Sequence, residues 1–236
     1  MVSSSVASES DTVLYTRAGP EIAVATTKAY TAQLVTLYLL AIKIARLRGR
    51  INTAEQKRLL GELDNTSDCL DEMLKSLPSR IKALSREYCM SRHMYFIGRN
   101  TDYAAAMEGA LKLKEISYIP CEAYAAGELK HGTISLIEKG TPVVALLGNR
   151  DLTAKTLSNI REVRSRGARI IALCRHDDYE KNKEEFSSFI PLPCCEGIFS
   201  ALYEGVALQL FAYYIAKKRG CDIDKPRNLA KSVTVE

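Results

Sequence analysis

The amino-acid sequence predicts an α/β protein in which a doubly wound parallel sheet with flanking helices follows a mostly helical N-terminal part. Two observations predict this class. From residue 91 onward, four short apolar runs without strict alternation are separated by helical patterns, as in a parallel sheet covered on both faces. Residues 1–90 instead contain long helical patterns and one short candidate strand. We therefore expect a boundary near residue 90, with residues 91–236 as the α/β part.

The N-terminal part begins with the candidate strand Thr12–Tyr15 and is then helical. A long helix is expected to end at Gly49, where glycine stops the apolar period. The sequence TAEQ at Thr53–Gln56 fits a capping box that opens the next helix. We expect this helix to end before Pro78, because the residue that precedes a proline is pushed out of the helical region. A further helix is expected over residues 79–90.

The C-terminal part alternates strands and helices. The four expected strands are MYFIG (94–98), PVVALLG (142–148), ARIIALC (168–174) and FIPLP (189–193). Three helices are expected in this part. The first has Asn100 or Thr101 as its N-cap, and the other two cover residues 152–166 and 198–219, each followed by a glycine. Ligands of doubly wound sheets bind at the carboxyl ends of the strands. The turn GRNTD, residues 98–102, is therefore a candidate ligand-binding turn.

Composition and charge argue against nucleic-acid and membrane partners. The net charge of +5 is modest and spread out, and no basic stripe is interleaved with aromatic residues. The apolar run over residues 29–42 is interrupted by Thr31, Gln33 and Thr36, and it is shorter than the about 20 residues that span a bilayer. We expect it to form a buried core helix or a dimer helix. The first residues lack the basic and apolar regions of a signal peptide.

Cysteine and motif patterns indicate a reduced protein without a metal site. The seven cysteines are odd in number, form no C-x-x-C pair and have no metal-ligand spacing to the three histidines. They are expected to be free thiols of a cytosolic protein. The sequence also has no G-x-G-x-x-G or G-K-[ST] phosphate loop and no G-x-S-x-G elbow, so it lacks the fingerprints of nucleotide binding and serine hydrolysis.

One predicted helix carries a narrow charged stripe of Glu108, Lys112 and Glu115. Steps of four and three residues return side chains to the same helix face, whereas the rest of this helix is largely apolar. The stripe has two interpretations. It is either a surface ion-pair series, worth about 0.2 to 0.5 kcal/mol per pair, or the wall of a polar cleft, where burial and a neighbouring ammonium tune a carboxylate for proton abstraction.

Two further segments have open interpretations at this level. His131 lies in GELKHG, where flanking glycines could present it to a ligand, although a lone histidine is more often structural. The C-terminal tail contains the helix-breaking Pro226 and the basic residues Lys225, Arg227 and Lys231 among small residues. A tail without periodicity is usually a frayed end.

Three segments carry a family resemblance: AGPEIAVATTKAYTAQL (18–34), EGALKLKEISYIPCEAYAAGELKHG (108–132) and KPRNLAKSVTVE (225–236). Together they closely resemble the isomerase region of the isomerizing glutamine–fructose-6-phosphate aminotransferases, the glucosamine-6-phosphate synthases. The resemblance runs over essentially the whole chain in the same order. It implies two sugar isomerase (SIS) half-domains, with residues 91–236 as a complete second half and residues 1–90 as the last part of the first. The family's serine- and threonine-rich phosphate loop and its glutaminase domain would lie outside this chain.

The resemblance also implies roles for individual residues. Glu115 would move a proton between C1 and C2 of the open-chain sugar, and Lys231 would engage the sugar carbonyl as an imine. His131 would assist ring opening and reach the site from the neighbouring subunit, which implies a homodimer. Lys112 and Glu108 would support this site. Three positions would line the sugar pocket: Val24, Thr26 (more often serine in the family) and Ala230.

The implied activity is formation of glucosamine 6-phosphate from fructose 6-phosphate and glutamine-derived ammonia. It includes a ketose-to-aldose isomerisation, in the cytoplasm, without a metal or an organic cofactor. One alternative is an inactive module that only binds a sugar phosphate or dimerises, because a phosphate loop outside the chain would leave the substrate without its anchor. Another is a relative of the SIS deglycases, which cleave amine-linked sugar phosphates. The terminal PRNLAKSVTVE favours the synthases.

Overall fold

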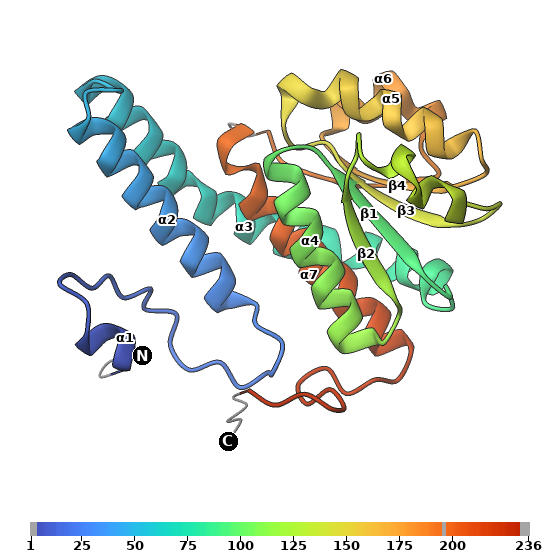
Figure 1. Ribbon diagram of the computed structural model, residues 1–236, viewed down its shortest axis with the longest axis horizontal. Helices are drawn as coiled ribbons and strands as arrows, with labels where there is room; N and C mark the ends of the chain where they lie inside the picture. Colours follow the sequence, from blue (N-terminus) through green and yellow to red (C-terminus); the bar gives the residue numbers. More distant parts are fainter. Residues whose placement is uncertain (1–3, 195–196, 232–236) are drawn as a thin grey trace.

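The computed structural model describes residues 4–194 and 197–231. Within them, one parallel sheet carries helices on both faces, and two long helices lie beside it (Figure 1). The helices are α1 (Ser5–Ser8), α2 (Lys28–Leu47), α3 (Thr53–Tyr88), α4 (Thr101–Ser117), α5 (Thr153–Arg164), α6 (His176–Asn182) and α7 (Ser200–Lys218). The strands are β1 (Met94–Gly98), β2 (Cys121–Ala125), β3 (Pro142–Leu146), β4 (Arg169–Cys174) and β5 (Ser188–Pro191). The predicted α/β class is confirmed.

The sheet has the order β2-β1-β3-β4-β5, and each neighbouring pair is parallel. The chain first adds β2 on one side of β1 and then β3 on the other, so the winding direction reverses between β1 and β3. In doubly wound sheets a crevice opens at this reversal, outside the carboxyl ends of the strands. The edge strand β2 is missing from the sequence prediction. It is half exposed and includes Glu122, and pairing with β1 rather than an apolar run makes it a strand.

Three expectations about the N-terminal part are wrong, and two of them concern helix α3. It continues through Pro78 to Tyr88, although proline removes one backbone hydrogen bond. Packing offsets that loss, because Leu77 and Ile81 on either side of the proline are buried in the core. The helix also begins differently, since the N-cap is Asn52, whose side chain accepts from the N–H of Glu55 at 2.8 Å. The expected strand Thr12–Tyr15 is wrong, because these residues are exposed and without regular structure.

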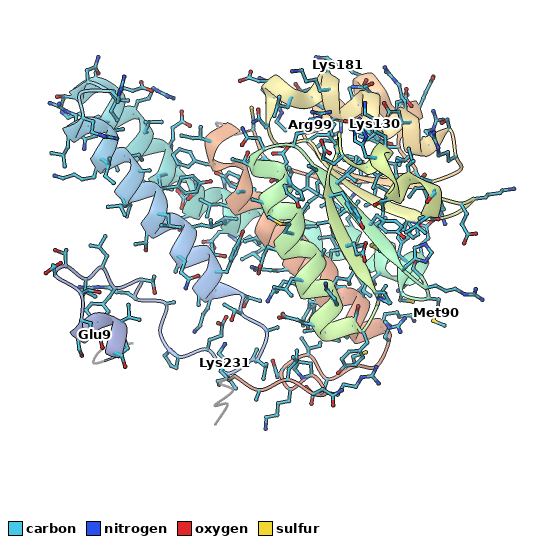
Figure 2. All side chains as sticks on the ribbon, in the orientation of Figure 1. Glu9, Met90, Arg99, Lys130, Lys181 and Lys231 are labelled. Atoms are coloured by element: carbon cyan, nitrogen blue, oxygen red, sulfur yellow. The ribbon has the colours of Figure 1, made fainter. Side chains whose placement is uncertain are left out.

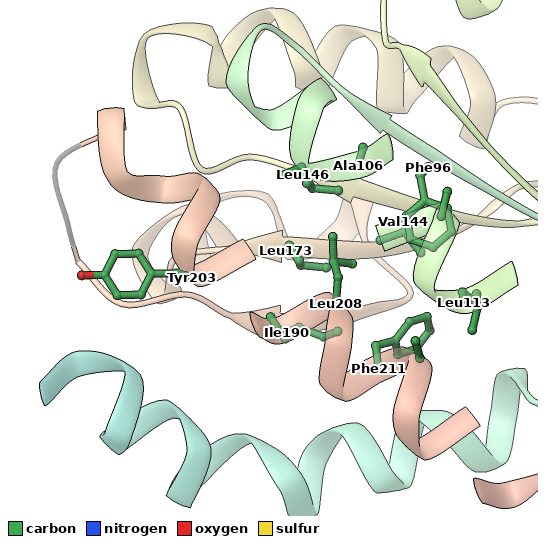
Figure 3. Close-up of a cluster of buried hydrophobic side chains, with 14 of the residues drawn as sticks. Phe96, Ala106, Leu113, Val144, Leu146, Leu173, Ile190, Tyr203, Leu208 and Phe211 are labelled. Atoms are coloured by element: carbon green, nitrogen blue, oxygen red, sulfur yellow. The ribbon is translucent and has the colours of Figure 1, made fainter. Parts of the chain in front are cut away.

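Helices α3, α4 and α7 cover one face of the sheet, and α5 and α6 cover the other (Figure 1). Figure 3 shows the larger core, where Phe96, Val144 and Leu173 on the strands face Leu208 and Phe211 on α7. Burying each such side chain stabilises the fold by about 1.5 to 3 kcal/mol. Helices α4 and α7 pack closely at Gly109, where an added Cβ would lie 2.5 Å from the Leu208 side chain. The position of α4 is therefore fixed.

Helix α2 is the exception to this packing. Among its residues, all of which the structure describes, Ile42 is buried while Leu37 and Leu47 are 60% and 72% exposed. Of the two expectations for this helix, the buried core helix is therefore wrong, and the dimer helix stays a prediction. By length and composition both α2 and Gly197–Lys218 could cross a bilayer, but the second is a core helix, 67% buried.

The described cysteines are free thiols, as expected. Cys89, Cys121 and Cys174 are buried, whereas Cys194 is exposed and Cys195 lies outside the described residues. Burial raises the pKa of the Cys121 and Cys174 thiols to about 12, so both are protonated, inert core residues.

Candidate active site

The charged stripe lies on the C-terminal half of α4. This helix leaves the carboxyl end of β1 and returns antiparallel to the strands, so its last turn reaches the amino end of the sheet. There the N–H of Met94, the first residue of β1, donates to the carbonyl of Pro120 at 3.0 Å. Tyr118 caps the helix in the left-handed conformation, with φ of 61°. We call this end of the sheet the amino edge.

The stripe is an ion-paired cluster that is largely withdrawn from solvent. Lys112 Nζ lies 2.6 Å from Glu115 Oε2 and 3.7 Å from Glu108 Oε1. The three side chains are 5%, 14% and 24% exposed, in the order Lys112, Glu108, Glu115. Burial raises the pKa of Glu108, Lys112 opposes that rise, and the net pKa stays above its usual value. The interpretation as an exposed surface pair is therefore wrong.

The C-terminal tail packs onto the same end of α4. The backbone N–H of Arg227 donates to Tyr118 Oη at 2.8 Å, and the Arg227 guanidinium lies 4.1 Å from the centre of the Tyr118 ring. Earlier in the tail, the carbonyl of Asp224 accepts from the N–H of Val24 at 2.9 Å. Pro226 between these contacts is buried. The described part of the tail is therefore anchored, and the interpretation as a frayed end is wrong; residues 232–236 of the terminal motif lie outside the described residues.

Lys231, the last described residue, reaches back to the segment before α2. Its Nζ lies 3.2 Å from Glu21 Oε2 and 2.9 Å from the Ala23 carbonyl oxygen. Figure 2 shows Lys231 beside the loop that leads into α2. Burial alone would raise the pKa of Glu21, but hydrogen bonds from Thr27 and Lys231 hold it below its usual value. Glu21 is absent from the sequence-based site. One local signal could have identified Glu21: it is an acidic residue shortly before helix α2, and the first turn of α2 contains no acidic residue of its own.

The three expected pocket-lining residues lie on the two segments that the Lys231–Glu21 bond joins. Val24 and Thr26 are half-buried in the loop before α2. Ala230 is exposed and directly precedes Lys231. The structure thus brings the tail, this loop and the end of α4 together at the amino edge.

His131 lies elsewhere. It ends the short 3-10 turn Leu129–His131, which follows the carboxyl end of β2, and it is exposed. Its neighbour Lys130 is at the opposite end of the molecule from Lys231 (Figure 2). Within one chain, His131 is therefore separated from the stripe and from the tail.

The carboxyl edge, where the general rule for doubly wound sheets predicts a ligand, is held by two buried carboxylates. Asp102, in the first turn of α4, accepts from the N–H of Asn149 at 3.1 and 3.2 Å. Glu204 of α7 accepts from the N–H of Gly148 at 3.2 Å. Both side chains are fully buried. An added Cβ at Gly148 would lie 2.5 Å from Glu204 Oε1, so this turn requires glycine.

Burial sets the protonation of this carboxylate pair. It raises the pKa of Asp102 to about 6, against the opposing hydrogen bonds from Asn149 and Gly148. Burial and the charge of Asp102 both raise the pKa of Glu204 well above its usual value. Arg99 in the candidate turn is bound to Asn159 Oδ1 at 2.7 Å. Arg99 and Asp102 of GRNTD therefore hold neighbouring elements. A cavity of about 590 Å³ at this edge is lined by residues after β3, of α3 and around the start of α7: Asn149, Arg150, Asp151, Glu62, Asn65, Cys69, Cys194, Gly197, Phe199 and Tyr203.

Within residues 4–194 and 197–231, no three His, Cys, Asp or Glu side chains gather in a way that could hold a metal ion. What the amino edge can do chemically follows from its side chains. It presents a partly shielded carboxylate, an ammonium bound to that carboxylate, and a second lysine held on a separate segment. This combination suits proton transfer and amine chemistry on a carbonyl compound.

Comparison with known proteins decides the family. The model of the SIS domain matches residues 1–43 and 88–215. The chain belongs to the SIS domain family. The SIS-type sheet predicted from the resemblance is thereby confirmed, as is the likeness to the isomerizing aminotransferases.

Several relatives share sequence with this SIS chain over its full length. It is 48% identical over 237 residues to the isomerizing glutamine–fructose-6-phosphate aminotransferase of Clostridium perfringens, and 50% identical over 236 residues to that of Symbiobacterium thermophilum. Each match covers 100% of this chain but 39% and 38% of the relative. The chain thus spans about two fifths of the length of these relatives.

Solved structures show the same fold. The C-terminal domain of glucosamine-fructose-6-phosphate aminotransferase from Francisella tularensis superimposes with a TM-score of 0.91 and 38% identity, over 96% of this chain and 64% of that one. A glucosamine-6-phosphate deaminase from Thermotoga maritima superimposes with a TM-score of 0.73 and 26% identity, over 98% and 64% of the two chains.

Proposed function

We propose that this SIS chain is the isomerase segment of an isomerizing glutamine–fructose-6-phosphate aminotransferase. It binds fructose 6-phosphate and converts ketose to aldose by moving a proton between C1 and C2, as part of glucosamine 6-phosphate formation in the cytoplasm. The single observation that carries the proposal is that the whole of this chain is 48% to 50% identical to part of proteins of that name. The ion-paired stripe on α4 lies inside the matched region and supports it.

Two residues carry the proposed chemistry. The neutral amine of Lys231 attacks the C2 carbonyl of the open-chain sugar, and loss of water leaves an imine. Ammonia then replaces the lysine nitrogen on C2 and frees the Lys231 amine, so that the sugar carries an imine of its own. The Glu115 carboxylate takes a proton from C1, which this imine has acidified, and returns it to C2, which leaves an amine on C2 and an aldehyde at C1. Without ammonia, the same proton transfer on the ketone itself gives glucose 6-phosphate. Lys112 supports this role because its bond to Glu115 Oε2, at 2.6 Å, orients the carboxylate and balances its charge.

His131 belongs to this proposal as a group donated to a second subunit. Its place beyond β2 separates it from the stripe of its own chain, so a homodimer is needed to bring it to a sugar. Residues 1–90 then act as the last part of a first SIS half, with Val24, Thr26 and Ala230 lining the sugar pocket and Glu108 supporting it. The exposed apolar side of α2 would be covered by another protein surface.

A second candidate is a module that binds a sugar phosphate or dimerises without turnover. This candidate is favoured because the chain matches 64% of the length of the solved C-terminal domain from Francisella tularensis, so about a third of that domain has no counterpart in it. The two candidates are separated by incubating the purified chain with fructose 6-phosphate and measuring glucose 6-phosphate with a coupled assay. Product that disappears in Glu115→Gln supports the isomerase. A folded chain, by circular dichroism, that binds the sugar phosphate without product supports the module.

A further inference from the structure

Glu21 divides its two carboxylate oxygens between two tasks. Oε1 accepts from the backbone N–H groups of Thr27 and Lys28 at 2.8 and 3.0 Å, and from Thr27 Oγ1 at 3.1 Å. Oε2 lies 3.2 Å from Lys231 Nζ. The Glu21 side chain is 8% exposed and that of Lys231 is 43% exposed, so the carboxylate is shielded while its bond to the ammonium is partly open to water.

The first set fixes the carboxylate in space. Residues 28–31, the first turn of α2, contain no acid, and Glu21 supplies the negative charge that stabilises a helix N-terminus from outside the helix. It is thereby attached to a helix of 20 residues rather than to a mobile loop. A carboxylate held in this way can hold another group in turn.

The second set fixes the lysine. A lysine ammonium ends a flexible four-carbon stem and has no position of its own. Lys231 Nζ has two acceptors from one short segment, Glu21 Oε2 and the Ala23 carbonyl oxygen at 2.9 Å. Two acceptors at separate points restrict where the nitrogen can lie. The segment before α2 therefore defines the resting position of Lys231.

We propose that Glu21 is a positioning residue that holds Lys231 at the amino edge before it reacts with a sugar carbonyl. This rests on the role of Lys231 in the proposed function. For reaction, the ammonium gives its proton to water, the free amine adds to C2 of the ketose, and the resulting carbinolamine loses water to form the C=N bond. Glu21 forms no bond to the sugar and acts through Lys231.

The test uses two variants that separate positioning from helix capping. Glu21→Gln keeps an amide oxygen for the N–H groups of Thr27 and Lys28 but loses the charge that binds the ammonium. Thr27→Val is the matched control, because it removes one donor to Oε1 and leaves Oε2 unchanged. Both variants should unfold within about 2 °C of the parent chain, since each loses a partly exposed interaction.

Two readouts are measured on the full chain. Without sugar, acetic anhydride labels lysines, and mass spectrometry gives the labelling rate of Lys231 relative to the exposed Lys225. Glu21→Gln should raise this ratio about three- to tenfold, because the nitrogen no longer has to leave a charge-assisted bond before it attacks the reagent. With fructose 6-phosphate, borohydride reduces any imine to a stable adduct. The adduct on Lys231 should fall about tenfold in Glu21→Gln, because the nitrogen is misplaced, and should persist in Thr27→Val.

An unchanged labelling ratio in Glu21→Gln, or an equal rise in Thr27→Val, would overturn the positioning role. The proposed function fails in a different way. If the parent chain gives no borohydride adduct on Lys231 while the labelling ratio still rises in Glu21→Gln, then Lys231 is not the imine-forming residue, and Glu21 still positions it.

Discussion

The two ends of helix α4 hold acidic residues in opposite ways. In the first turn, Asp102 faces Glu204 of α7, and both carboxylates are fully buried against the turn after β3. In the last turns, Glu108 and Glu115 share Lys112 between them. The first end lies at the carboxyl edge of the sheet and the second at the amino edge. Helix α4 thus takes part in two acidic pairs: one with Glu204 of α7 and without a lysine, and one within α4 that includes Lys112.

The difference shows what a single intervening cation does. At the carboxyl edge, burial raises the pKa of Asp102 to about 6, and burial with the charge of Asp102 raises the pKa of Glu204 well above its usual value, so the pair favours protonated forms. At the amino edge, burial also raises the pKa of Glu108, but Lys112 opposes the rise. Charged, partly accessible carboxylates serve proton transfer better than buried protonated ones. The four predictions below test this contrast, in order of expected effect.

The largest effect is expected at the amino edge. Glu115→Gln should lower the rate of conversion of fructose 6-phosphate to glucose 6-phosphate about 10²- to 10⁴-fold, the usual contribution of a general acid/base. Sugar affinity should change little, because the amide keeps the size and most hydrogen bonds of the carboxylate. Turnover is measured by the coupled assay and affinity by calorimetry. Unchanged turnover would remove Glu115 from the proposed mechanism.

At the carboxyl edge, the expected effect is a pH dependence of stability. Because the folded pKa of Asp102, about 6, lies above the unfolded value of 3.8, this group stabilises the fold below about pH 4 and loses that contribution as the pH rises through 6. Relative to Asp102→Asn, the parent chain should lose about 2.4 kcal/mol of unfolding free energy between pH 4 and pH 7. Urea unfolding of both proteins across this range measures the difference, and parallel curves would contradict the raised pKa.

Lys112→Met should make the amino edge resemble the carboxyl edge. Without the shared cation, two partly buried carboxylates lie close together, and we expect a loss of about 2 kcal/mol of unfolding free energy at pH 7. The loss should shrink as the pH falls, because burial raises the pKa of Glu108 above its usual value and its carboxylate then loses its charge earlier than an exposed one. Lys114→Met is the control, because Lys114 is exposed on the same helix and should cost within about 0.5 kcal/mol. Equal losses in both variants would show that Lys112 contributes no special ion pairing.

The smallest effect concerns the tail that crosses the amino edge. Tyr118→Phe removes the hydroxyl that accepts from the Arg227 N–H at 2.8 Å but keeps the ring beneath the guanidinium. One lost hydrogen bond of about 1 kcal/mol should speed exchange of the Arg227 amide about fivefold. Hydrogen exchange followed by NMR measures this rate. No change would mean that the ring contact, rather than the hydroxyl, anchors the tail.

Local pattern alone predicts a large part of this molecule. Strands β1, β3, β4 and β5 and helix α4 follow from apolar runs and helical periodicity, and the stripe follows from steps of four and three residues. The edge strand β2 does not follow, because its half-exposed residues form a strand by pairing with β1. Nor does the continuity of α3 through Pro78, which the buried neighbours Leu77 and Ile81 maintain.

The sequence by itself determined which residues share a helix face and which family the motifs resemble, because backbone geometry repeats over a few residues and motifs are read along the chain. Only the tertiary structure decided that Lys231 meets Glu21, 210 residues away, and that Asp102 meets the turn after β3. Ion pairing and pKa depend on distance through space and on the loss of water around each charge. Both quantities exist only once the sheet, the helices and the tail are packed together.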